Sequence, residues 1–107
     1  MTETRVTLIP KPDVPIACTL DGREAVDRTT AWKELLAGVT ARETTANGMR
    51  LRLPSEPSLV ARIAELTVKE AECCAFFAFA ITIEHDGVWL DVAAPADGMA
   101  IVAELFA

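Results

Sequence analysis

The chain lacks any apolar stretch long enough to cross a membrane. Its longest apolar run, from Cys73 to Ile81, has about half of the residues that a membrane-spanning helix needs. Residues 1–6 also lack the basic-then-apolar pattern of a secretory signal. We therefore expect a soluble, cytoplasmic protein that has no membrane partner.

The chain also lacks an excess of positive charge. It has 10 Lys and Arg against 16 Asp and Glu, which gives a net charge of −6 and a pI of about 4.7. Because phosphate contacts need a basic patch, we expect no nucleic-acid partner. Arg42, Arg50 and Arg52 form a local basic cluster, which we interpret as a solvated edge of the sheet.

Several common enzyme signatures are missing. The sequence contains no Gly-rich phosphate loop, no Ser-His-Asp signature and no H-E-x-x-H motif. The single histidine, His85, precedes Asp86-Gly87 and is predicted to be a turn residue. Catalysis by a Cys-His pair is therefore poorly supported.

Glycine and proline are scarce, and the composition is that of a globular domain. The chain has 107 residues, of which 51% are hydrophobic and 24% charged. Residues 1–13, with Pro10 and Pro12, are predicted to form a leader or edge segment. Residues 14–107 are predicted to form a single α+β domain.

Hydrophobic periodicity and turn signals predict eight elements. The first half contains a strand at 14–20, a helix at 23–37, and a hairpin of 39–45 and 48–54 around Asn47-Gly48. The second half begins with a helix that has Pro57 in its first turn and ends near Cys74. A hairpin of 77–83 and 88–92 around Asp86-Gly87 follows, and a last helix comes after Asp97. The first six match the ferredoxin-like split βαβ order, β-α-β-β-α-β. The remaining strand and helix would extend one edge of an antiparallel sheet that has its helices on one face.

Cysteine and glutamate form the main candidate site. Three cysteines do not suit a disulfide framework, which normally uses an even number. On the second helix, Glu70 lies on the same side as Cys73 and Cys74, three and four residues later. That side also carries the apolar stripe of Leu59, Ile63 and Leu66. A carboxylate buried there needs a partner, which would be a metal, a proton, or a salt bridge to Arg23 or Arg28.

The ferredoxin-like order would bring Cys18 to the same corner, at the end of the first strand. Cys18, Cys73 and Cys74 with Glu70 then make a plausible ligand set for zinc or another soft metal ion, such as cuprous, mercuric or trivalent arsenic ions. Adjacent cysteines differ from the C-x-x-C spacing of structural zinc sites, and two neighbours rarely reach one ion without a distorted backbone.

Two other functions are compatible with these residues. Cys18 precedes the N-terminus of the 23–37 helix, which favours a thiolate nucleophile, so a thiol redox or detoxifying enzyme is one alternative. The other is a structural dimerisation module whose cysteines only pack in the core. The small, weakly polar residues of the open sheet face would then be the homodimer interface; they are Ala17, Thr19, Ala78, Ala80 and Thr82.

Three segments together carry a family resemblance: Cys18-Thr-Leu, Arg28-x-x-x-Trp32, and Glu70-x-x-Cys73-Cys74-x-Phe76-x-x-Phe79. This pattern resembles a group of small, largely uncharacterised bacterial proteins, and is similar to modules joined to MerR-like metal-responsive regulators. Those proteins often have proline after the Cys-Cys pair, where this chain has Ala75. The resemblance covers about residues 15–106 and implies a metal-related function at Cys18, Glu70, Cys73 and Cys74.

Overall fold

The computed structural model describes residues 8, 10 and 22–107. The elements are α1 (Gly22–Leu36), β1 (Ala41–Thr45), β2 (Gly48–Leu53), α2 (Pro57–Cys73), β3 (Ala78–Glu84), β4 (Gly87–Ala93), a short 3₁₀ helix (Ala96–Gly98) and α3 (Met99–Phe106). They confirm an α+β fold with a four-stranded antiparallel sheet and three helices. The predicted strand 14–20, and with it Cys18, lies outside the described residues, as does most of the expected leader 1–13.

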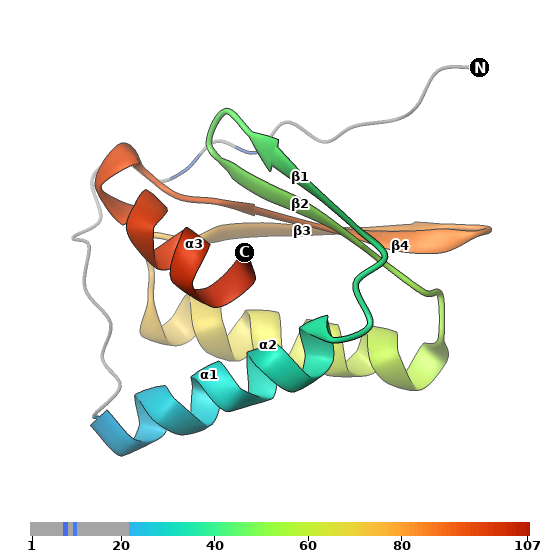
Figure 1. Cartoon of the computed structure of the whole chain (residues 1–107), viewed down its shortest axis with the longest axis horizontal. Coiled ribbons are helices and arrows are strands. Elements are labelled where there is room, and N and C mark those ends of the chain that lie inside the picture. Colours follow the sequence, from blue (N-terminus) through green and yellow to red (C-terminus); the bar gives the residue numbers. More distant parts are fainter. Residues whose placement is uncertain (1–7, 9, 11–21) are drawn as a thin grey trace.

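The strand order among the described residues is β1-β2-β4-β3 (Figure 1). The ferredoxin-like order is therefore not confirmed, and one part of that prediction is wrong. The 88–92 strand does not extend an edge, because β4 lies between β2 and β3 and pairs with both. Leu90 is opposite Leu51 on one side and Ile81 on the other.

β4 takes the central position because both of its faces are largely buried. Val88, Leu90 and Val92 point to one face and are at most 1% exposed. On the other face, Asp91 is 6% exposed and Trp89 is partly buried. A strand buried on both faces belongs in the middle of a sheet, whereas a half-solvated strand suits an edge.

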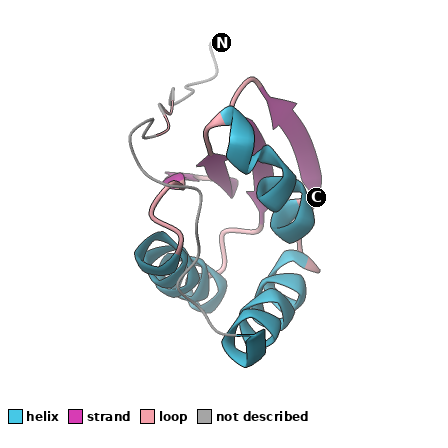
Figure 2. Cartoon of the chain, turned by 90° about the vertical axis from the view of Figure 1, so that its left-hand side faces the viewer, coloured by secondary structure: helices cyan, strands magenta, loops and turns pink. Residues whose placement is uncertain are grey.

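The three helices cover one face of the sheet. Figure 1 shows α1 and α2 below the strands, and Figure 2, turned by 90°, shows α3 between α1 and the strands. Leu51, Leu53 and Leu90 form one core with Trp32 and Phe106 from the helices. Burying this apolar face is the main source of stability for such a two-layer fold. No described helix has the length and apolar character that a membrane span requires.

The opposite face carries a stacked group of arginines. The guanidinium carbons of Arg50 and Arg52 lie 4.1 and 4.8 Å from the ring centre of Trp89, which is cation–π distance. Arg50 is only 2% exposed, so the interpretation of this cluster as a solvated edge is wrong for Arg50. The expected homodimer interface on this face stays a prediction.

Candidate functional site

Glu70 is a buried carboxylate held by an indole. It lies in the last turn of α2 and is 1% exposed. Nε1 of Trp32 donates a hydrogen bond of 2.7 Å to Oε1 of Glu70. Trp32 is itself fixed, because it is fully buried and packs edge-on against Phe106 and stacked with Phe79. One oxygen of the carboxylate therefore has a rigid hydrogen-bond partner.

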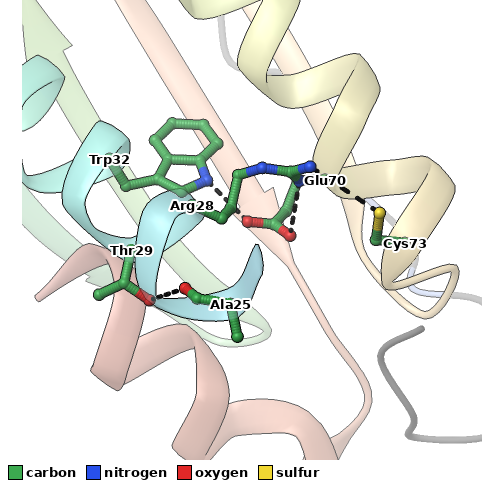
Figure 3. A network of polar contacts seen from close by, with 6 residues as sticks. All are labelled: Ala25, Arg28, Thr29, Trp32, Glu70 and Cys73. Carbon is green, nitrogen blue, oxygen red and sulfur yellow. Dashed lines mark hydrogen bonds and ion pairs between the residues drawn. The ribbon is translucent and has the colours of Figure 1, made fainter. Parts of the chain in front are cut away.

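The second oxygen of Glu70 has a cationic partner. Arg28 lies one helical turn before Trp32 on α1, and its Nη1 is 3.4 Å from Oε2 of Glu70 (Figure 3). The Arg28 side chain is 14% exposed. Of the partners considered for this carboxylate, the salt bridge to an arginine early in α1 is therefore the one that the structure shows, with Arg28 as the partner. An ion pair with this much burial is screened less by water than a surface pair.

Arg28 also contacts one of the two adjacent thiols. Its Nη2 lies 3.9 Å from Sγ of Cys73, the last residue of α2. Figure 3 shows Trp32 and Arg28 on α1 facing Glu70 and Cys73 on α2. A linked set of contacts therefore runs from Trp32 through Glu70 and Arg28 to the sulfur of Cys73; we call these four residues the Arg28 network.

Cys74 sits where the backbone leaves the helix. Its φ of −122° and ψ of 79° are not helical, although its N–H still donates to the carbonyl of Glu70 at 2.7 Å. Cys74 is 2% exposed and belongs to the core, whereas Cys73 is partly exposed. Both are thiols. The backbone therefore leaves the helical conformation between the two thiols.

Two aromatic rings follow the thiol pair directly. Phe76 and Phe77 are 0% and 3% exposed, and their ring centres are 4.5 Å apart. The chain turns here through a hydrogen bond from the N–H of Phe77 to the carbonyl of Cys74. Cys74 therefore lies in an apolar, dry part of the core.

Among the described residues, no three metal-ligating side chains come together. Of the predicted ligands, the structure links Glu70 to Cys73 through Arg28 and places Cys74 next along the chain, while Cys18 lies outside the described residues. Both oxygens of Glu70 already have partners. In this structure Glu70 therefore holds Arg28 and Trp32, and its expected role as a metal ligand stays a prediction.

Sequence reasoning missed the joint role of Arg28 and Trp32. The signal was available, because a cation and an indole four residues apart lie on the same side of a helix. Arg28 also forms part of the wall of a groove of about 450 Å³ between α1 and α2. The other charged residues that line this groove are Glu24, Asp27, Arg62 and Lys69. Solvent therefore reaches the neighbourhood of the Arg28 network from this groove.

No protein-family model, curated protein or solved structure matches this chain.

The two thiols are expected to differ in native reactivity. In a Cys18→Ser background, a chain that keeps Cys73 should react with a water-soluble disulfide reagent at least about 10-fold faster than one that keeps Cys74, because a buried thiol reacts only after local opening. The comparison uses the Cys74→Ser and Cys73→Ser variants, read by absorbance. Both should react at the same rate in urea, and equal native rates would contradict the burial difference.

Proposed function

We propose that the protein binds a soft metal ion at the C-terminal end of α2, with Cys73, Cys74 and Cys18 as thiolate ligands. The observation that carries the proposal is the contact of Arg28 with the sulfur of Cys73. Metal-bound thiolates need hydrogen-bond donors around them, and such outer contacts fix the ligand and tune the ion. A guanidinium held in place by a buried carboxylate is a donor of this kind.

The number of thiol ligands favours a metal ion of low coordination number. The described residues offer two thiols, from Cys73 and Cys74, and a four-coordinate zinc site would need donors beyond these. Soft ions such as cuprous or mercuric ion prefer thiolates and accept few ligands. Glu70 acts in this proposal by positioning Arg28, because its oxygens are engaged by Arg28 and Trp32.

A cytoplasmic location suits this proposal. Thiols stay reduced there, and a soft ion competes with protons rather than with a disulfide for the sulfur atoms. Each thiol that becomes a ligand releases one proton.

Native mass spectrometry tests the proposal directly. Apo protein is titrated with zinc, mercuric ion or arsenite, beside a Cys18/Cys73/Cys74→Ser triple variant. We expect one soft ion per chain with loss of the matching number of protons, and no ion in the triple variant. Undiminished binding by the triple variant, or no adduct with any ion, would contradict the proposal.

A matched pair of arginine variants tests the role of the Arg28 network. Arg28→Met is expected to weaken soft-ion affinity by about 10–100-fold, the usual effect of removing an outer-shell partner. Arg62→Met removes a charge from the same groove and leaves the contact between Arg28 and Cys73 in place, so it should leave the affinity within about twofold. Equal losses in both variants would indicate a general charge effect instead.

A thiol enzyme is the second candidate, because a guanidinium beside a sulfur also suits a reactive thiolate. This alternative predicts one rapidly reacting thiol and a disulfide that forms readily, in the absence of tight metal binding. Thiols that stay inert until the protein unfolds, with no metal adduct, would favour the packing module instead.

A further inference from the structure

Within the described sheet, the outer edge of β3 has no partner strand. β3 pairs with β4 and has no second partner among the described strands. Glu84 and Gly87 flank a two-residue turn, so they must form a hydrogen-bonded pair. Because hydrogen-bonded and non-bonded pairs alternate, the backbone N–H and C=O groups of Phe79, Ile81 and Ile83 point away from β4.

Among the described residues, this edge carries little of the usual protection against pairing. Natural edge strands carry lysine, proline or other charges that prevent sheets from joining. The other edge strand of the described sheet, β1, follows this rule with Arg42 and Glu43. β3 has the sequence Ala-Phe-Ala-Ile-Thr-Ile-Glu, in which the only charge is the terminal Glu84.

The surface beside this edge is apolar as well. A groove of about 300 Å³ between α2 and β3 is lined by Thr67, Val68, Ala71, Phe79 and Ile81. Val68 and Ile83 are 60% and 68% exposed, and both lie beside this edge. The charged residues Arg62 and Lys69 of α2 line the other groove, toward α1. The apolar groove and the exposed side chains of Val68 and Ile83 therefore lie beside the β3 edge that has no partner in the described sheet.

We propose that two copies of this chain associate by antiparallel pairing of β3 with β3 of the second copy, which extends the sheet across both. A twofold axis at Ile81 pairs all seven residues of the strand, and places Phe79 opposite Ile83 of the second copy. This register uses only outward-pointing backbone groups, as a hydrogen-bonded pair at Ile81 requires. It is the self-complementary contact that a twofold dimer needs.

The same register accounts for the exposed apolar residues and the charges. Phe79 opposite Ile83 is a favourable aromatic and β-branched pair on the helix-covered face, and it brings the exposed Ile83 to the groove beside Ala71. Glu84 falls opposite Ala78 of the second copy. The two Glu84 carboxylates are therefore about 20 Å apart along the strands, too far to repel strongly. This interface does not depend on the metal site.

Sedimentation equilibrium of the full chain tests the dimer, with two lysine variants of matched exposure. Ile83→Lys puts a charge into the proposed interface and should raise the dimer dissociation constant by at least about 100-fold. Val26→Lys, at a position on α1 that is 65% exposed, should leave it unchanged. A monomeric wild type at the highest concentration, or equal effects of the two variants, would overturn the proposal.

A second measurement identifies what covers the edge. Amide exchange at Ile81 should become slower as protein concentration rises, because the second copy protects this N–H. Protection that is independent of concentration would mean that the chain's own 14–20 segment covers β3, and would overturn the dimer. Val68→Glu, at a position 60% exposed, is the additional variant if Ile83→Lys does not fold; it too should dissociate the dimer.

Discussion

Replacing Glu70 with alanine is expected to lower the free energy of unfolding by about 3–5 kcal/mol, the usual cost of breaking a buried ion pair by removing one partner. The substitution leaves the buried indole N–H of Trp32 without its acceptor and Arg28 without its counter-ion. It also leaves a cavity at a position that is 1% exposed. Urea unfolding followed by circular dichroism measures the change.

Glu70→Gln separates the hydrogen bond from the charge. The amide oxygen can still accept from Trp32, so this variant should lose about 1–2 kcal/mol, less than the alanine variant. Glu72→Ala, an exposed change in the same helical turn, should stay within about 0.5 kcal/mol. A loss below about 1 kcal/mol for Glu70→Ala would show that the Arg28 network contributes little to stability. Under the proposed function, Glu70→Gln also weakens soft-ion binding, because it loosens Arg28.

The helices and hairpins could be predicted because each depends on residues that are close together in the sequence. The helix predicted at 23–37 is observed at 22–36, and the second hairpin is present, with its turn at His85-Asp86, one residue before the predicted Asp86-Gly87. Periodicity and turn residues depend on neighbours a few positions apart, so they can be recognised in one sequence. The first hairpin is shifted by one residue: Ala46 and Asn47 form the turn and Gly48 begins β2.

The strand order was not predictable in the same way. Whether Leu90 lies in the middle of the sheet depends on partners that are distant in sequence. The sequence predicted an open sheet face opposite the helices, but on this face Trp89 stacks against Arg50, and Asp91 is 3.8 Å from Arg50. Charged residues can be buried on a sheet face when they pair and stack there, and periodicity does not record this.

The candidate site was predictable in part. A carboxylate on an apolar stripe has to find a partner, and an arginine early in α1 was one of the alternatives, although the sequence was interpreted in favour of a metal. The choice of Arg28 over Arg23 depends on the packing of α1 against α2, which brings Arg28 and Trp32 to the same carboxylate. The spacing already puts Arg28 and Trp32 on one side of α1, but the helix packing decides that both of them reach Glu70.

Replacing Gly48 with alanine is the second change with a large expected effect. Gly48 lies at the start of β2, opposite Ala93 of β4, and a Cβ at this position would collide with the carbonyl of Val92 and come within 3.0 Å of the Cα of Ala93. No described residue has a positive φ. The Asn47-Gly48 pair therefore does not need glycine for a left-handed backbone. Glycine is needed at position 48 because a side chain would not fit between β2 and β4.

The cost should be high because the obstacle is backbone in the central strand. β4 cannot move away from β2 without disturbing its pairing with β3, so we expect Gly48→Ala to lose about 2–4 kcal/mol, at or above the usual range for overpacking. Gly38→Ala is the matched control, since its Cβ would meet only the carbonyl of Leu35 at 3.8 Å. That variant should be neutral or stabilised by up to about 1 kcal/mol through the unfolded state. Equal unfolding midpoints for the two variants would show that β2 and β4 can separate at this point without loss, and that the close approach is not a constraint on the fold.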